Sequence, residues 1–541
     1  MDEFDYVIAG SGTAGSVLAS RLTEDPGVRV LLLEAGDAWI PANVDVAPLW
    51  FTLLGSEVDW DYRSVPQPGL GGRVTREPRG KMPGGSSNLY LMMHVRGHPS
   101  DFDNWAYQGA PGWSYADLLP YFLKLEAQED KAGRISGGPG LLPLTNAGQH
   151  AANPLSRVFI DSCVELGYAE TADFNLWSSG LGGSQMFGAG WHRLNVVEGQ
   201  RRGVLRSFLE PVLDRPNLTL RTNAHTTRLI IEQQRCVGVE FRQGSPSGQH
   251  DSGPDGGPDG GRNVASAAPA EPGTYTVRAA AEVIVACGAI DSPKLLMLSG
   301  IGDPERLRDL GIPVVAEVPG VGENFHNHVL TGVIAETREP VQAGQQNLSE
   351  SALFAASQSG LPAPDLQLAF VHVPFDPVLG QEHPNSVSIL PGVVRPFSRG
   401  WVRLASADPM ARPLLNPNYL GDAADRTRLV QAVKLAREIF TAPSFASVLK
   451  GEVLPGTEVR TDAELTEFVR AHADSYHHHA GSCRMGTDDQ SVVDPSLRVH
   501  GLAGVRVVDA SVIPAVPSGN PHAAIAAIAE RAVDLLKERP S

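Results

Sequence analysis

The sequence has few cysteines and no long apolar run. Cys163, Cys236, Cys287 and Cys483 are the four cysteines among 541 residues, and no two have Cys-x-x-Cys spacing. Such scattered thiols predict neither a disulfide framework nor a zinc ribbon, and they favour a reducing compartment. No segment approaches the roughly 18 uninterrupted apolar residues of a membrane-spanning helix, and no basic stretch precedes the first apolar run. We therefore expect a cytoplasmic protein without membrane insertion.

The chain also lacks a block of positive charge. Its formal net charge is −17, and the basic residues are spread along the sequence. Nucleic acids and anionic membranes bind a positive protein face, so neither is an expected partner. With 42% apolar and 19% charged residues, the chain can build packed cores. A length of 541 residues exceeds one hydrophobic core and predicts several domains.

The first motif is the glycine pattern in residues 4–22, FDYVIAGSGTAGSVLASRL. After a predicted strand, Gly10 permits a tight turn, Gly12 lets the backbone approach a pyrophosphate, and Gly15 lets the next helix pack on the strand. The amides at the helix start then face the phosphates. A second predicted strand, VRVLLLEAG, ends in Glu34, 19 residues past Gly15, where an acid binds a ribose diol. The pattern predicts a dinucleotide site, and NAD and FAD both stay open.

Three later stretches complete the organisation. Residues 244–273 are rich in Gly, Pro, Ser and Asp, and they predict a mobile loop connecting the two strands of an extended hairpin. Residues 365–406 alternate like antiparallel strands with one covered face, which predicts a second sheet for the substrate. Near the end we expect a helix with Asn520 as its N-cap, Pro521 as its first residue and an end near Lys537.

Residues 475–486, SYHHHAGSCRMG, place three of the 16 histidines in a row. Adjacent side chains in extended backbone point to opposite faces, and the helical i, i+4 spacing of metal ligands is absent. We therefore expect no metal site. On spacing alone, histidines without chemistry are the simpler interpretation. Cys483, in the same stretch, is expected to be a buried packing thiol.

Four segments together resemble the glucose-methanol-choline (GMC) flavin oxidoreductases, over essentially the whole chain. They are GSGTAGSVLASRL…LLLEAG, PRGKMPGGSSNLYLMMHVRGHPSDFDNW (78–105), GAIDSPKLLMLSGIG (288–302), and HHHAGSCRMG with VVDASVIPAVPSGNPHAAIAAIAERA. The resemblance implies an α/β fold, α+β overall, with a Rossmann-like FAD-binding domain built from several segments and a substrate domain with an antiparallel sheet. It places residues 1–160, 190–315 and 465–541 in the first domain and residues 161–189 and 316–464 in the second.

The resemblance also implies the cofactor, FAD rather than NAD, and its contacts. The expected cofactor-binding residues are Gly10, Ser11, Gly12, Thr13, Ala14, Gly15, Glu34, Ala35, Gly80, Gly84, Gly85, Ser86, Ser87, Leu89, Tyr90, Leu91, Met92, Gly288, Asp509, Ala510, Asn520, Pro521 and His522. Leu89 stands where choline oxidase has the histidine bonded to its flavin, so non-covalent FAD is expected. Tyr90 stands where the family usually has Asn, and this departure bears on how the flavin reacts with oxygen.

The same alignment places His478 at the family's catalytic histidine and His522, 44 residues further on, at its second catalytic position. Oxidising an alcohol requires removal of its hydroxyl proton, and a histidine with a reference pKa of about 6.5 is a suitable base. The resemblance implies that His478 is this base and that hydride passes to flavin N5. His522, held neutral at a helix N-terminus, would hydrogen-bond the same oxygen.

The expected function is FAD-dependent oxidation of a small primary alcohol to the aldehyde. A hydroxynitrile lyase with structural FAD and a fatty-acid photodecarboxylase stay open as alternatives in the same fold. The expected partners are a small alcohol and an electron acceptor, either oxygen or a quinone- or dye-type compound. The sequence specifies neither the alcohol nor the acceptor nor the oligomeric state.

Overall fold

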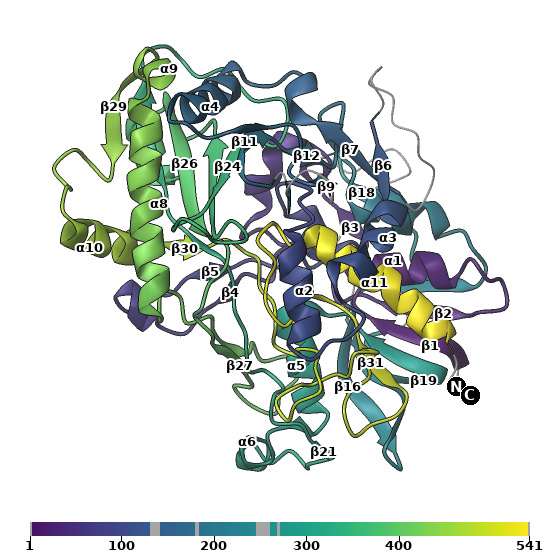
Figure 1. The fold of residues 1–541 in the computed structure, drawn as a ribbon. Helices are drawn as coiled ribbons and strands as arrows, with labels where there is room; N and C mark the ends of the chain where they lie inside the picture. Colours follow the sequence, from purple (N-terminus) through teal and green to yellow (C-terminus); the bar gives the residue numbers. More distant parts are fainter. Residues whose placement is uncertain are drawn as a thin grey trace.

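Two large sheets with helices packed on them form the main body of the described structure, and several sheets of two or three strands lie beside them (Figure 1). The computed structural model describes residues 3–129, 141–178, 183–184, 186–244, 260–267 and 271–538. The chain passes between the two sheets several times, so segments that are far apart in the sequence lie side by side. The mixed α/β fold expected from the sequence is confirmed.

The first sheet is a parallel sheet extended by antiparallel strands. Its order is β15 (Leu218–Arg221), β2 (Val30–Leu33), β1 (Glu3–Ala9), β19 (Gly273–Val285), β17 (Arg235–Gln243) and β16 (Ala224–Glu232), and β31 (Val505–Val507) also pairs with β19. The pairs among β15, β2, β1, β19 and β31 are parallel. Their carboxyl ends therefore lie at one edge, which is where ligands bind in such sheets.

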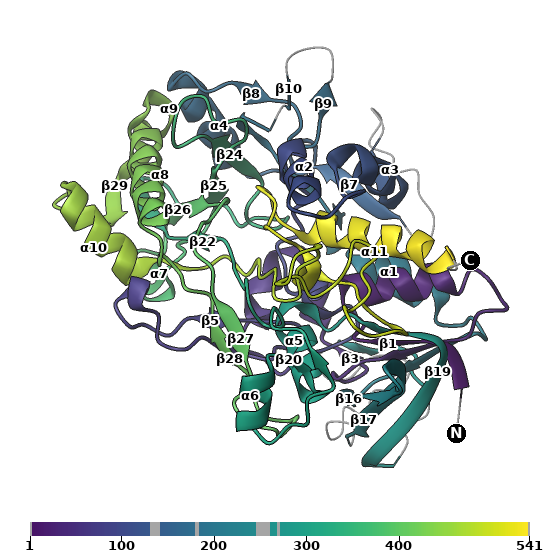
Figure 2. The ribbon, with the colours of Figure 1, turned by 60° about the horizontal axis from the view of Figure 1, so that its bottom comes forward.

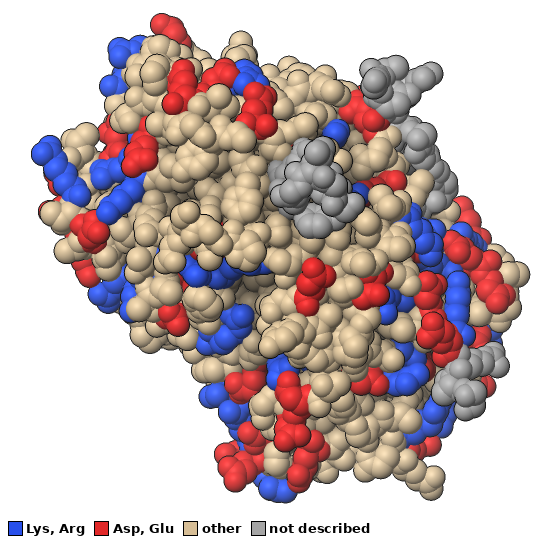
Figure 3. Space-filling model, viewed as in Figure 1, with Lys and Arg blue, Asp and Glu red and all other residues tan. Residues whose placement is uncertain are grey.

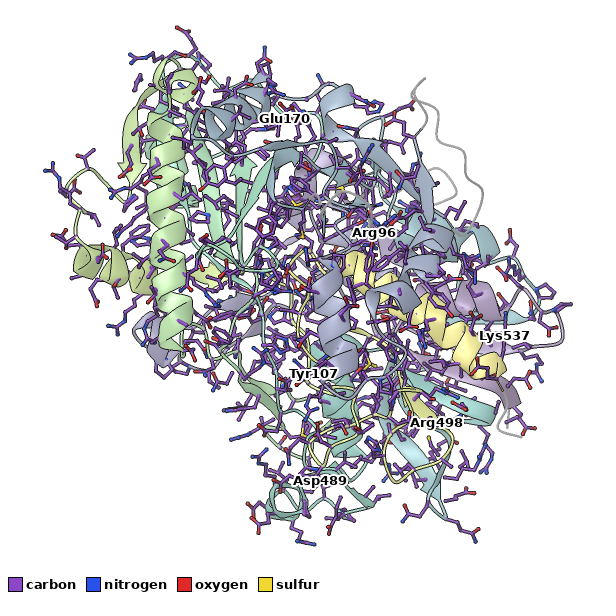
Figure 4. All side chains as sticks on the ribbon, viewed as in Figure 1. Arg96, Tyr107, Glu170, Asp489, Arg498 and Lys537 are labelled. Carbon is purple, nitrogen blue, oxygen red and sulfur yellow. The ribbon has the colours of Figure 1, made fainter. Side chains whose placement is uncertain are left out.

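Helices α1 (Thr13–Leu22) and α11 (His522–Lys537) lie side by side on this sheet, with α3 (Tyr115–Leu125) next to α11 (Figure 2). Helix α11 ends at Lys537, as predicted, and it runs outward from the middle of the molecule (Figure 4). Its start differs from the prediction: Pro521 is the N-cap, without a side-chain cap bond, and His522 is the first helical residue. Asn520 does not cap the helix because its amide contacts His478 and Gln367 instead.

The second sheet is almost entirely antiparallel. Its order is β29 (Leu449–Leu454), β23 (Val333–Thr337), β26 (Ser386–Val393), β25 (Leu366–Val371), β24 (Ser351–Ala355), β11 (Gly188–Trp191) and β8 (Glu170–Thr171), and β22 (Val329–Leu330) pairs with both β26 and β30 (Asp474–Ser475). The long helix α8 (Ala423–Thr441) covers one face. The pairing of β22 with β30 brings residue 329 next to residue 475.

The prediction that this sheet has one exposed face is wrong, because every residue of β25 and β26 is buried. The strand residues Leu366, Leu368 and Phe370 belong to the core that includes α8, whereas Ala369 and Val371 belong to an inner cluster. The polar residues that gave the alternation, such as Gln367, lie on the inner face and not in solvent. Strand β27 (Trp401–Arg403) pairs with β28 (Leu414–Asn416) and lies outside this sheet.

The glycine-rich stretch 244–273 joins two strands of one hairpin, as predicted, because β17 and β19 pair antiparallel with Gln243 opposite Gly273. Much of the stretch, residues 245–259 and 268–270, lies outside the described residues. Residues 260–267 contradict the prediction of an unpacked loop: β18 (Arg262–Asn263) pairs with β3 (Trp39–Ile40), and Val264 is buried. Arg262 anchors this segment by an ion pair with Glu210.

The surface in Figure 3 has acidic and basic side chains interspersed, without a large field of either sign on that face. Among the described residues, no helix is both long and apolar enough to span a bilayer. We propose that the two domains follow the two sheets. The predicted borders place the residues of β30 in the last segment of the first domain, residues 465–541. In the structure, β30 pairs with a strand of the second sheet.

Candidate active site

A cavity of about 870 Å³ extends from the carboxyl edge of the first sheet to the inner face of the second. Most of the predicted site residues line it: Gly10, Gly12, Thr13, Ala14, Glu34, Ala35, Gly80, Gly85, Ser86, Ser87, Leu89, Tyr90, Leu91, Gly288, His478, Asp509, Ala510, Asn520, Pro521 and His522. The other predicted residues, Ser11, Gly15, Gly84 and Met92, are outside this lining. Four distant parts of the sequence therefore build one site.

At the first-sheet end, the glycine turn has the geometry that the sequence predicts. Gly10 has a φ of +99°, which favours glycine, and a Cβ on Gly15 would lie 1.9 Å from the Gly10 carbonyl oxygen. Gly15 is therefore needed for helix α1 to pack on β1. A Cβ on Gly12, by contrast, would meet no protein atom within 4 Å. Gly12 thus leaves open space beside the start of α1, where a phosphate group fits.

Two buried carboxylates lie at the same end. Glu34, directly after β2, accepts hydrogen bonds from the amide and hydroxyl of Ser11, at 3.1 and 2.5 Å. Asp509, shortly after β31, accepts from the Gly288 amide at 2.9 Å and the Ser292 hydroxyl at 2.5 Å. Burial raises the pKa of both carboxyl groups, and these donors counteract that rise. Asp509 holds the start of α5 (Gly288–Leu298) against the loop that follows β31.

At the other end, the three consecutive histidines diverge. His477 has a φ of +63°, in the left-handed region that residues other than glycine rarely adopt, and this turn separates its ring from the next. The His479 Nε2 atom lies 2.5 Å from the buried carboxylate of Glu77, while His478 faces Asn520. Within the described chain, no group of three or more His, Cys, Asp or Glu side chains is arranged to hold a metal.

The His478 ring makes a contact through each of its nitrogens. Its Nε2 atom lies 3.2 Å from Asn520 Nδ2, and its Nδ1 atom lies 2.9 Å from His328 Nδ1. Its backbone amide donates to Asn327 Oδ1 at 2.7 Å. The Tyr476 ring stacks on it, with centroids 4.6 Å apart. These contacts fix the ring plane and direct Nε2 toward the start of α11.

His522 has a different environment. It is 7% exposed, and neither of its ring nitrogens has a hydrogen-bond partner among the described residues. Its ring packs on Tyr90, with centroids 4.4 Å apart, and the Arg201 guanidinium lies 5.4 Å from the Tyr90 ring. The Tyr90 hydroxyl donates to Asn195 at 2.7 Å. Because buried polar atoms are normally paired, the free nitrogens of His522 indicate a place for a ligand.

Burial keeps these rings neutral. It lowers the pKa of His478 well below the ordinary value, and the neighbouring His328 lowers it further. It also lowers the pKa of His328 to about 3, and that of His522 to about 3, with smaller contributions from His94 and Arg201 at His522. A neutral imidazole has one lone pair and one N–H group. Each ring can therefore accept one proton or hydrogen bond and donate another.

Beside the histidines, the cavity wall is formed by the second sheet and β30. Leu330, Val371 and Leu390 belong to one apolar cluster, with Tyr476 packed against it. Asp474 is opposite Leu330 in the β22–β30 pair and also lines the cavity. Burial raises the pKa of the Asp474 carboxyl group to about 6. This end of the cavity is thus apolar, with one acidic side chain on the wall.

Sequence reasoning missed His328 and the contact between Asn520 and His478. His328 is 150 residues from His478, and the strand pair β22–β30 brings the two together. It also missed Glu77, which lies beneath His479 and accepts the Ser475 hydroxyl at 2.7 Å. Asn327, next to His328 in the sequence, belongs to the same network. Its amide oxygen holds the His478 backbone, and its Nδ2 donates to the Ser475 hydroxyl at 2.9 Å.

Comparison with protein families agrees with this arrangement. The amino-terminal model described as GMC oxidoreductase matches residues 4–255 and 257–330, and the carboxyl-terminal model with the same description matches residues 396–529. The human mitochondrial choline dehydrogenase is 37% identical, with all of this chain and 91% of the human protein aligned. An oxygen-dependent choline dehydrogenase of Escherichia coli is 36% identical over 99% of this chain and 96% of its own.

Solved structures agree as well. The pyridoxine 4-oxidase from Mesorbium loti superposes with a TM-score of 0.86 at 32% identity, covering 99% of this chain and all of that one. A formate oxidase of Aspergillus oryzae, studied for its FAD modification, gives a TM-score of 0.83 at 26% identity, with 99% and 98% of the two chains covered. The similarity extends over both sheets and every segment that lines the cavity.

Proposed function

The chain belongs to the GMC oxidoreductase family, and on that premise we propose that it oxidises a small primary alcohol to the aldehyde with His478 as the base. The chain is an FAD-dependent oxidoreductase that acts on alcohols, as its relatives are. The observation that supports the finer proposal is the buried His478 ring, whose Nε2 atom faces the cavity while Nδ1 is engaged by His328.

The described residues fit the family cofactor. The open space at Gly12, the amides at the start of α1 and the buried Glu34 suit the adenosine diphosphate half, as in other dinucleotide sites. Leu89 has no nucleophilic atom to bond a flavin, in keeping with non-covalent FAD. When bound, FAD would supply the hydride acceptor, which we propose to be flavin N5.

His478 is suited to receive the hydroxyl proton at Nε2. In the neutral ring this atom has a lone pair, and only the long contact with Asn520 Nδ2 occupies it. A substrate hydroxyl that hydrogen-bonds to Nε2 replaces this contact and frees the Asn520 amide. That amide can then donate to the same oxygen. As the proton moves to Nε2, electron density builds on the oxygen, and hydride departure from the adjacent carbon becomes favourable.

His522 completes the set of groups around that oxygen. Both of its nitrogens are free among the described residues, and its low pKa keeps it a neutral donor. A neutral N–H group aimed at a developing negative oxygen stabilises it without any rearrangement. We therefore propose that His522 donates to the substrate oxygen, while Tyr90, packed against its ring, holds it in place.

The cavity wall supports a small alcohol and favours a positively charged one. The apolar residues Leu330 and Val371 and the aromatic ring of Tyr476 suit alkyl groups, and Asp474 supplies a negative charge beside them. Aromatic rings and a carboxylate together are the usual surroundings of an ammonium group. Choline, which relatives of this chain oxidise according to their names, has this chemistry.

An anaerobic absorption titration tests the proposal. The FAD-loaded protein is mixed with choline, other amino alcohols, benzyl alcohols and simple aliphatic primary alcohols. We expect at least one class to bleach the oxidised flavin bands, and readmitted air then shows whether oxygen restores them. If no alcohol bleaches the flavin, the proposal fails. Cyanohydrin cleavage or carbon dioxide release under blue light would then identify a lyase or a photodecarboxylase.

A further inference from the structure

The closest polar contact of the His478 ring is with another histidine. His328 lies just before β22, is fully buried, and places its Nδ1 atom 2.9 Å from His478 Nδ1, with the two rings nearly perpendicular at 89°. We propose that His328 is a positioning residue that fixes His478 in the tautomer with its proton on Nδ1. This inference rests on the proposed function for its catalytic consequence, although the tautomer itself can be measured without a substrate.

The hydrogen bonds determine where each proton sits. Asn520 Nδ2 is a donor only, so its contact with His478 Nε2 requires a lone pair on that nitrogen. A neutral His478 must then have its proton on Nδ1. A contact of 2.9 Å between two nitrogens needs a single proton between them, so His328 Nδ1 is the acceptor. His328 in turn has its own proton on Nε2.

The surroundings of His328 fix its charge state. Backbone groups of Val394 and Pro517 raise the pKa of His328, although its Nε2 atom makes no hydrogen bond among the described residues. Burial dominates, however, and keeps the ring neutral. A nearby ring, His326, shows the opposite tautomer: its Nδ1 atom lies 2.5 Å from the Asn324 carbonyl, and its Nε2 atom accepts the Val516 amide at 2.9 Å. The tautomers of His326 and His328 are therefore determined by different hydrogen-bond partners.

A histidine as the orienting group has a specific consequence. A carboxylate on Nδ1 would stabilise the protonated base by charge, whereas neutral His328 offers only a lone pair. The other charged and titratable groups that act on His478 are His477, Arg79 and His479, and each of them lowers its pKa. His328 thus orients the base without making it permanently protonated. Loss of His328 would free the proton to move to Nε2, where it would block the base.

The test compares two substitutions of one residue. His328→Asn keeps an acceptor oxygen near the position of Nδ1, whereas His328→Leu removes the acceptor at similar volume. His192→Leu is the control, because His192 is also fully buried, has no hydrogen-bond partner for its ring among the described residues and does not contact His478. All variants are studied as FAD-loaded protein with thermal unfolding recorded, so that a general loss of stability is recognised.

The direct readout is NMR of FAD-loaded protein containing nitrogen-labelled histidine, with the His478 signals identified from their absence in His478→Gln. We expect wild type, His328→Asn and His192→Leu to have the His478 proton on Nδ1, and His328→Leu to shift it largely to Nε2. A proton on Nε2 in the wild type, or an unchanged tautomer in His328→Leu, would overturn the inference. This readout is valid even if no alcohol reduces the flavin, so it separates failure of this inference from failure of the proposed function.

The kinetic readout is the rate constant of anaerobic flavin reduction by an active alcohol. His328→Leu should lower it by about 10²-fold, a large part of what a general base contributes, and His328→Asn should restore it to within about 5-fold of wild type. The pH dependence of this rate constant should also shift in His328→Leu and remain that of the wild type in His192→Leu. Equal losses in His328→Asn and His328→Leu would assign His328 a merely structural role.

Discussion

At the first-sheet end of the cavity, the two buried carboxylates have hydrogen-bond partners within the protein, whereas at the histidine end several buried ring nitrogens have none among the described residues. Glu34 and Asp509 each accept two or more hydrogen bonds from nearby amides and hydroxyls. The ring nitrogens of His522, equally buried, have no partner among the described residues. The glycine turn with Glu34 and Asp509, called the cradle below, is thus preformed and positions a ligand by its shape and backbone groups. The histidine end keeps unpaired hydrogen-bonding atoms that a reacting substrate can use.

The largest expected effect removes the base. His478→Ala should lower the rate constant of anaerobic flavin reduction by about 10²- to 10⁴-fold, because the hydroxyl proton loses its acceptor. FAD content should stay at the wild-type level, since the cradle is untouched. Stopped-flow absorbance measures the rate, and His192→Ala, which removes an equally buried ring outside the site, is the matched control. A loss of less than ten-fold would remove His478 from the base role.

A second change tests the free nitrogens of His522. His522→Leu should slow flavin reduction by about 10²-fold, the usual cost of losing one donor to a developing negative oxygen. His522→Asn keeps an amide donor and should retain most of the rate. If the two variants are equally slow, the imidazole acts by packing on Tyr90 and not by hydrogen bonding.

At the cradle end, a pair of glycine substitutions separates ligand binding from folding. Gly12→Ala adds a methyl group in open space, so the FAD-free protein should unfold at the wild-type temperature while FAD affinity falls about 10²-fold. Gly15→Ala places the same methyl group against the Gly10 carbonyl and should destabilise the protein itself, by about 3 kcal/mol. Fluorescence titration with FAD and thermal unfolding distinguish the two. Normal FAD binding by Gly12→Ala would show that the cofactor does not approach this turn.

The smallest substitution effect concerns the cavity wall. Asp474→Asn should raise the KM for cationic alcohols about 10-fold, the size of one modest charge interaction, with little change for neutral alcohols. Steady-state kinetics with choline and with a neutral alcohol of similar volume measure the ratio. Equal changes for both substrates would mean that Asp474 does not contact the charged group.

The comparison also shows which parts of the site are readable from the sequence. The glycine turn and Glu34 follow from local pattern, because the turn, the helix start and the acid depend on residues within one strand–helix–strand unit. His478 and His522 followed from resemblance and could not have been found from spacing. His328 depends on the pairing of β22 with β30, which no local pattern encodes.

Two mispredictions have the same physical origin. The second sheet looked half-exposed because residues such as Gln367 are polar, yet they face inward, and Gln367 contacts Asn520 beside the base. Residues 260–267 looked unpacked because of their composition, yet Val264 is buried and Arg262 is held by Glu210. In both cases tertiary partners far along the chain, and not local composition, decide where the residues lie.

The most direct test of the account is the pH dependence of anaerobic flavin reduction in the wild-type protein. Burial lowers the pKa of His478, so the ring is neutral and ready to accept a proton well below the usual histidine range. We therefore predict a rate constant that changes less than about two-fold between about pH 6 and pH 8, and that falls only at lower pH. A decline with a midpoint near about pH 6.5 would contradict the account, because it would show a base with an ordinary, solvated pKa.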